Sequence, residues 1–115
     1  MKRIYELRNL WHEFNDNDFA GRLTPITLLC KRNQSKDGWY EYRAHADWTP
    51  IRHELWRAAI VVCDGCWAEG VMQGTLAHEM IHQYQCEVLD VAPHHDSTFK
   101  RMARALEAKY DIVIR

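Results

Sequence analysis

The sequence predicts a small α+β domain, and three observations carry that prediction. The length of 115 residues suits one domain, so we assign residues 1–115 to a single folding unit. Apolar residues recur at helical spacing in three segments, namely 3–18, 68–88 and 96–109. Shorter runs with strand character lie between the first two of these segments, at 26–31, 39–46 and 58–63. The order of one helix, three strands and two helices is typical of the α+β class.

The N-terminal helix is predicted over residues 3–18. Its apolar side chains recur every three or four positions and would form one buried face: Ile4, Leu7, Leu10, Trp11 and Phe14. Gly21 lies just beyond the last of them and fits a helix stop signal.

The three strands have different characters. Residues 26–31 form an apolar run, residues 33–38 are rich in turn formers, and residues 39–46 alternate aromatic and polar side chains. We therefore expect the first two strands to pair as a hairpin. Residues 47–50 would end the second strand. Residues 58–63 are rich in β-branched residues and are the best candidate for a buried strand.

Two further helices and a short terminal strand are expected in the second half. The helical period runs over residues 68–88 and again over residues 96–109. Ser97 or Asp96 could cap the start of the last helix. Residues 112–114 are expected to add a terminal strand.

Composition narrows the class of protein. The formal net charge is −1, which argues against a polybasic protein that coats nucleic acid. No apolar run approaches the ~18 residues of a membrane helix, and the charged N-terminus lacks the apolar core of a signal peptide. We therefore expect a cytoplasmic monomer in a reducing compartment, with thiols rather than disulfides at Cys30, Cys63, Cys66 and Cys86.

The chemistry is carried by His78-Glu79-Met80-Ile81-His82, an HExxH motif on the second predicted helix. Residues four apart differ by about 40° around a helix, so both imidazoles can converge on one metal ion. Glu79 borders the same face and can act as the proton-shuttling base. The composition predicts roughly 0.03 chance occurrences of this motif per chain, and the alternative is a polar helix face with two solvated histidines.

A catalytic zinc site usually takes a third protein ligand and keeps one position for water. The metzincin pattern requires glycine and histidine where Gln85 and Val88 stand, so that class is excluded. From spacing alone His94 and His95 are nearly even candidates. Carboxylates are further alternatives: Glu87, Asp90, Asp96 and Glu107.

Three segments resemble the SprT-like zinc metallopeptidases, a family that includes Spartan. The family's FNxxxFxGxL opening is similar to the segment that contains Phe14, Asn15, Phe19, Gly21 and Leu23. Thr75 to His82 resembles its TLxHExxH helix. His95 to Lys100 resembles its HGxxFK segment, in which the histidine is the third ligand. Asp96 and Ser97 depart from the Gly and Pro usual there.

The resemblance implies a zincin-like fold and a specific site. One zinc ion would be held by His78, His82 and His95, with Glu79 as the general base of a peptidase. It also implies protein substrates bound or crosslinked to DNA, an intracellular place near DNA or the nucleoid, and a role in DNA–protein crosslink repair. The compact chain lacks the zinc ribbon that many members carry, so DNA contact is the least direct part of this expectation.

Other interpretations remain open. Cys63 and Cys66 form a CxxC that could be half of a zinc site or a redox pair, although a strand end and turn explain it too. Aromatic and basic residues between 31 and 48 could stack on single-stranded nucleic acid, or pack as a hairpin face: Lys31, Arg32, Lys36, Trp39, Tyr40, Tyr42, Arg43 and Trp48.

Two other functions are compatible with the sequence. The chain could be a non-catalytic adaptor that keeps zinc as a structural staple and binds protein or DNA. A fourth side-chain ligand, such as Cys86 or a carboxylate, would favour that adaptor. The chain could also be a nucleic-acid-binding module with an incidental HExxH. The remaining histidines lack ligand-type spacing and are expected on the surface or in packing: His12, His45 and His53.

Overall fold

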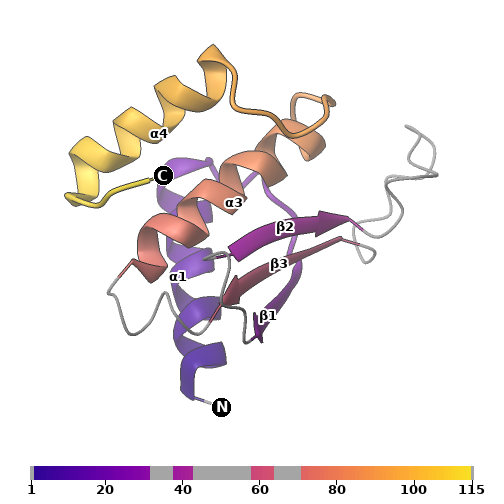
Figure 1. Cartoon of the computed structure of the whole chain (residues 1–115), viewed down its shortest axis with the longest axis vertical. Helices are drawn as coiled ribbons and strands as arrows, with labels where there is room; N and C mark the ends of the chain where they lie inside the picture. Colours follow the sequence, from indigo (N-terminus) through magenta and orange to yellow (C-terminus); the bar gives the residue numbers. More distant parts are fainter. Residues whose placement is uncertain (1, 32–37, 43–57, 64–70, 115) are drawn as a thin grey trace.

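The computed structural model describes residues 2–31, 38–42, 58–63 and 71–114. Its elements, in chain order, are α1 (Lys2–Asp18), β1 (Thr27–Lys31), β2 (Gly38–Tyr42), β3 (Ala58–Cys63), α3 (Met72–Glu87) and α4 (Ser97–Tyr110). Helix α3 is central, since it contacts α1, α4, β2 and β3 (Figure 1). Within the described residues, no helix is long and apolar enough to span a membrane.

The three predicted helices are confirmed. In α1 the expected apolar face is buried through Leu7, Trp11 and Phe14. Helix α3 begins at Met72, and the predicted positions 68–70 lie outside the described residues. Helix α4 is capped by the Asp96 carboxylate, which accepts a hydrogen bond from the Phe99 N–H at 2.9 Å.

The predicted hairpin between the first two strands is wrong. The three strands form one sheet in the order β1-β3-β2, so β3 separates β1 from β2. Strand β3 runs parallel to β1 and antiparallel to β2. A central strand has partners on both edges, and β3 is the strand with the most β-branched, apolar sequence. Of the turn predicted at 33–38, residues 33–37 lie outside the described residues, as does the break at 47–50, whereas Gly38 belongs to β2.

The predicted terminal strand is also wrong, because residues 112–114 form no strand. This segment packs against α3 instead. A Cβ added to Gly74 would lie 1.9 Å from the Val113 carbonyl oxygen, so only glycine allows this close approach. The Ile114 N–H then donates to Glu107 Oε2 at 2.9 Å, which anchors the segment to α4.

The segment after α1 has a specific hydrogen-bonded turn. The Gly21 N–H donates to the Asn15 carbonyl at 2.8 Å, and Gly21 has a φ of +68°, which glycine adopts without strain. The Asn15 side chain donates to the Leu23 carbonyl and accepts from the Leu23 N–H, both at 3.0 Å. Asn15, Gly21 and Leu23 of the FNxxxFxGxL-like segment therefore close the turn that leads toward β1.

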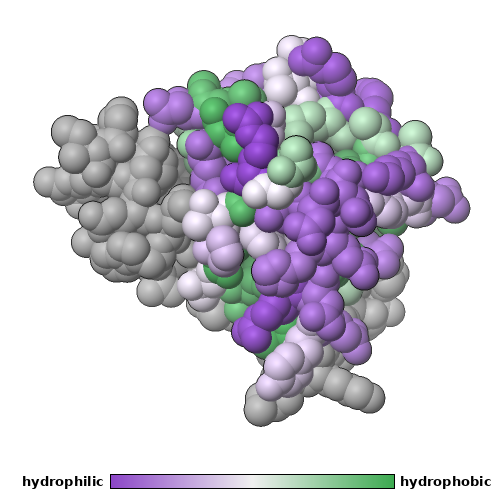
Figure 2. Space-filling view, turned by 180° about the vertical axis from the view of Figure 1, so that it is seen from behind, coloured by the Kyte–Doolittle hydropathy of each residue, from purple (hydrophilic) through white to green (hydrophobic). Residues whose placement is uncertain are grey.

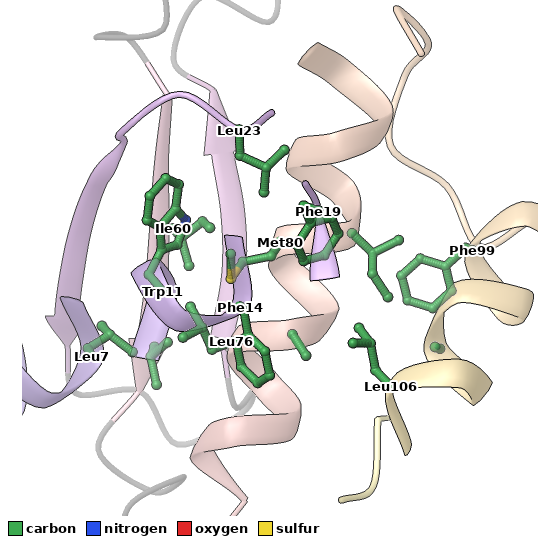
Figure 3. Close-up of a cluster of buried hydrophobic side chains, with 14 residues drawn as sticks. Leu7, Trp11, Phe14, Phe19, Leu23, Ile60, Leu76, Met80, Phe99 and Leu106 are labelled. Carbon is green, nitrogen blue, oxygen red and sulfur yellow. The ribbon is translucent and has the colours of Figure 1, made fainter. Parts of the chain in front are cut away.

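One apolar core joins the helices to the sheet (Figure 3). Residues from α1, β3, α3 and α4 are buried together in it, including Trp11, Ile60, Leu76, Met80, Phe99 and Leu106. The face of the molecule seen from behind is largely hydrophilic over the described residues (Figure 2). This agrees with the polar outer positions of α1.

A polar network centred on a buried glutamine lies where α3 faces α1. The fully buried Gln83 accepts a hydrogen bond from Trp11 Nε1 at 3.1 Å. Its amide nitrogen donates to the Thr24 carbonyl at 2.9 Å and to Glu87 Oε2 at 2.7 Å. The Thr24 N–H donates to Glu87 Oε1 at 2.8 Å. Because these polar groups are partners of one another, the network joins α1, the turn and α3 without leaving the buried Gln83 amide unsatisfied.

Candidate metal centre

Helix α3 places His78 and His82 on one face. Their Nε2 atoms lie 3.2 Å apart, and their ring centroids are 4.9 Å apart. One helical turn separates the two residues, so the helix itself sets this convergence. The neighbouring positions Leu76, Ala77 and Met80 are fully buried, which holds the helix in place behind the histidines.

The chain reverses after α3 and brings a third imidazole to the pair. His95 Nε2 lies 3.1 Å from His82 Nε2 and 3.1 Å from His78 Nε2. His94 points elsewhere: its Nδ1 lies 2.7 Å from the Ala92 carbonyl oxygen and its Nε2 lies 3.0 Å from Asp96 Oδ2. Spacing left the two histidines nearly even, and the structure brings His95 into the cluster.

Asp96, which follows His95, fixes the entry to α4. Its Oδ1 accepts the capping hydrogen bond from Phe99, and this hydrogen bond lowers the pKa of the Asp96 carboxyl. Asp96 departs from the glycine of the family pattern, yet it supplies the cap that orients the start of the helix. The departure is therefore compatible with a defined position for His95.

Three Nε2 atoms this close cannot all be satisfied by protons. A ring nitrogen carries either a proton or a lone pair, so hydrogen bonds can fill at most two edges of such a triangle. A cation that accepts a lone pair from each nitrogen satisfies all three. Zinc–imidazole bonds of about 2.0–2.1 Å with tetrahedral angles place adjacent nitrogens about 3.3 Å apart. The separations of 3.1–3.2 Å therefore fit a metal site of three imidazoles.

The environment of His82 favours its neutral form. Burial lowers the pKa of His82, although the hydrogen bond to Gln85 acts in the opposite direction. His82 Nδ1 lies 2.8 Å from Gln85 Oε1, and an amide oxygen can only accept. The proton therefore sits on Nδ1, which leaves the Nε2 lone pair directed at the other two histidines.

Phe99 forms an apolar floor under the cluster. Its ring centroid lies 4.9 Å from those of His78 and His82, and 4.7 Å from that of His95. The side chain is 5% exposed, so it shields the imidazoles from water on that side. Phe99 falls in the segment that resembles HGxxFK, but the sequence assigned it no role at the site. Phe99 lies in the first turn of α4, only four residues after His95, and this short spacing is the signal that could have placed it at the site.

Glu79 lies beside the cluster. Its Oε2 atom is 3.8 Å from His78 Nε2, and the residue is 6% exposed. It does not belong to the group of three ligand atoms. A carboxylate in this position can hold a proton next to the metal-binding face without occupying a ligand position.

The other candidate ligands do not join the three histidines. Glu87 is held by Thr24 and Gln83, and burial raises its pKa. Glu107 accepts from Ile114. Cys86 is a buried thiol, as expected, but the group that could hold a metal contains neither Cys86 nor Asp90. His12 lies exposed on α1, as predicted.

Several sequence candidates lie at or beyond the edge of the described residues. Cys63 ends β3, and Cys66 lies outside the described residues, as do His45, His53, Arg32, Lys36, Arg43 and Trp48. The backbones of Trp39, Tyr40 and Tyr42 belong to β2 and pair with β3. The predicted contact with nucleic acid in this region therefore stays a prediction.

No family model, curated protein or solved structure matches this chain in the three comparisons.

Proposed function

We propose that the chain is a zinc-dependent endopeptidase of the SprT-like type with a zincin-like fold. The observation that carries the proposal is the triangle of three Nε2 atoms, 3.1–3.2 Å apart, with the Glu79 carboxylate beside it. Two of the histidines and the glutamate come from one HExxH motif, and the third histidine comes from the segment that resembles HGxxFK.

His78, His82 and His95 would hold one zinc ion per chain through Nε2. When bound, zinc polarises a scissile carbonyl and lowers the pKa of water. Three imidazoles accept several divalent metals, and the choice of zinc rests on ligand type and on the family resemblance.

Glu79 supplies the base. Its carboxylate would take a proton from the attacking water and pass it to the leaving amine, which is the usual role of the glutamate in HExxH. The low exposure of Glu79 favours this role, because a buried carboxylate exchanges its proton with the bound reactants rather than with bulk water.

We further propose that the substrates are proteins bound or crosslinked to DNA, in the cytoplasm or at the nucleoid. This substrate class rests on the family resemblance. Exposed cations on α4, the helix that starts beside His95, are compatible with a nearby phosphate backbone: Lys100, Arg101 and Arg104.

The alternative function is an adaptor that uses zinc only as a staple. Such a structural site needs four protein ligands. Among the described residues, the potential metal group consists of three imidazoles, without Cys86 or a carboxylate. A three-ligand group is what a peptidase uses, so the peptidase is the better-supported function.

Cleavage assays on a Glu79 variant test the proposal. We expect the zinc-loaded protein to cleave an unfolded protein substrate, and Glu79→Gln to lose about 10²- to 10⁴-fold of that rate while it keeps its zinc. Glu13→Gln, at an exposed position of α1, is the matched control and should retain full activity. A DNA-binding protein, assayed with and without DNA, tests the substrate class.

Three results would contradict the proposal. A fully active Glu79→Gln protein would exclude Glu79 as the base. Zinc-loaded protein that cleaves no substrate, with or without DNA, would favour the adaptor. Cleavage that is indifferent to DNA would leave a peptidase but would remove DNA-bound proteins as its substrate class.

A further inference from the structure

Gln85 has partners on both sides of the histidine cluster. The side chain is fully buried at the last turn of α3. Its Oε1 atom faces His82 Nδ1 at 2.8 Å and accepts from the His94 N–H at 3.2 Å. Its Nε2 atom donates to the His94 carbonyl at 2.8 Å and approaches Asp96 Oδ1 at 3.4 Å. One amide therefore contacts the second histidine and both neighbours of the third.

These contacts determine the orientation of the Gln85 side-chain amide, that is, where its oxygen and its nitrogen lie. The backbone N–H of His94 can only donate, and its carbonyl can only accept. Gln85 must therefore present oxygen to the former and nitrogen to the latter. The oxygen that receives the His94 N–H is the same atom that faces His82 Nδ1. The loop backbone thus dictates, through Gln85, that His82 carries its proton on Nδ1.

The same contacts hold the loop. The two hydrogen bonds to the His94 backbone fix the residue just before His95, and the contact with Asp96 lies just after it. The Val91 N–H also donates to the Gln85 backbone carbonyl at 3.0 Å. His95 therefore sits between points that Gln85 anchors to α3.

We propose that Gln85 is the positioning residue of the metal centre: it fixes the tautomer of His82 and the placement of His95 in one step. This inference rests on the proposed metal site. Outer-shell hydrogen bonds to a ligand imidazole fix ring orientation and tautomer, and their loss typically weakens metal binding by about 10- to 100-fold.

Gln83 provides a matched control within the same helix. It is also a fully buried glutamine, but it bonds to Trp11, Thr24 and Glu87 and to none of the three histidines. Gln85→Met and Gln83→Met remove the same amide with little change in volume. Both variants leave buried polar groups without partners, so both should lose stability.

The experiment combines two readouts on these variants. Zinc affinity is measured by competition with a chromophoric chelator, and nitrogen NMR of the metal-free protein reports the His82 tautomer in mildly alkaline solution. We expect Gln85→Met to bind zinc about 10- to 100-fold more weakly than wild type and to lose the single Nδ1–H form of His82. Gln83→Met should keep wild-type zinc affinity and the Nδ1–H form.

A second variant keeps the inference testable if Gln85→Met fails to fold. Gln85→Glu retains an acceptor for His82 but places a carboxylate oxygen against the His94 carbonyl. We expect it to keep the Nδ1–H form and still bind zinc more weakly than wild type, because the anchor of the His95 loop is lost.

The inference is overturned if Gln85→Met binds zinc as tightly as Gln83→Met, or if His82 keeps the Nδ1–H form without the Gln85 amide. A Gln85→Glu protein with wild-type zinc affinity would contradict the anchoring of His95. Wild-type protein that binds no zinc would refute the proposed metal centre itself, whereas the tautomer measurement would still decide whether Gln85 sets the proton position of His82.

Discussion

Two opposite sides of helix α3 each carry a buried glutamine, and the two glutamines have different roles. Gln83 and Gln85 are both fully buried. Residues two positions apart on a helix are rotated by about 200° around its axis, so the two side chains face nearly opposite directions. On the packing side, Gln83 joins α1, the turn at Thr24 and α3. On the site side, Gln85 joins His82 to the backbone of the loop that carries His95.

The comparison shows that burial alone does not distinguish a structural from a functional polar group. Loss of either amide leaves buried partners unsatisfied and lowers stability. Only the site-side amide touches a histidine of the cluster, so only its loss should change metal binding. The following variants test that separation, from the largest expected effect to the smallest.

Phe99, on α4, belongs both to the apolar core and to the site, because its ring also contacts all three imidazoles. We expect Phe99→Ala to lower the free energy of unfolding by about 3–5 kcal/mol and to weaken zinc binding. Leu106→Ala, on the same helix and in the same core, should lose about 2–5 kcal/mol with unchanged zinc affinity. Urea unfolding and zinc competition measure the two effects. Equal zinc affinity in both variants would remove Phe99 from the site.

Trp11→Phe tests the packing side. The substitution removes the indole N–H that Gln83 Oε1 accepts, and it leaves a fully buried acceptor without that partner. We expect the free energy of unfolding to fall by about 1–3 kcal/mol, with zinc affinity unchanged. Thermal and urea unfolding give the first quantity. A clear loss of zinc affinity in the folded variant would show that the two sides are coupled.

Asp96→Ala tests the cap of α4. Loss of the hydrogen bond from the Phe99 N–H should lower the free energy of unfolding and loosen the position of His95. Ser97→Ala is the control, because the structure assigns the cap to Asp96 and not to Ser97.

The cap also makes stability depend on pH. The cap hydrogen bond lowers the pKa of Asp96, so the stability that the ionised carboxylate contributes is present above the ordinary aspartate pKa and is lost as the pH falls through the lowered value. Urea unfolding over a pH series should therefore show wild type and Asp96→Ala converging in acid, and equal stability at neutral pH would refute the cap.

The helices could be predicted from the sequence because their signals are local. The period of Leu7, Trp11 and Phe14 defines the buried face of α1, and it needs no knowledge of distant residues. Strand pairing is not local. Strands β1 and β2 follow one another in the sequence, yet the apolar strand Ala58–Cys63 lies between them in the sheet.

The candidate site divides in the same way. The positions of His78, Glu79 and His82 follow from one helix, so their spacing was sufficient to place them. The choice between His94 and His95 depends on a loop conformation that spacing does not determine. Gln85 and Phe99 were missed because each acquires its role only when α3, the loop and α4 are packed together.

The most direct test of the metal centre is the zinc content per chain after dialysis of wild type, His95→Ala and His94→Ala. The neighbouring histidine is the matched control, since His94 points to Ala92 and Asp96 rather than to the cluster. We predict about one zinc per chain in wild type and in His94→Ala, and a large loss of zinc in His95→Ala. Only the His95→Ala substitution removes a ligand of the three-imidazole site. Equal zinc in all three proteins, or none in wild type, would contradict the three-histidine centre.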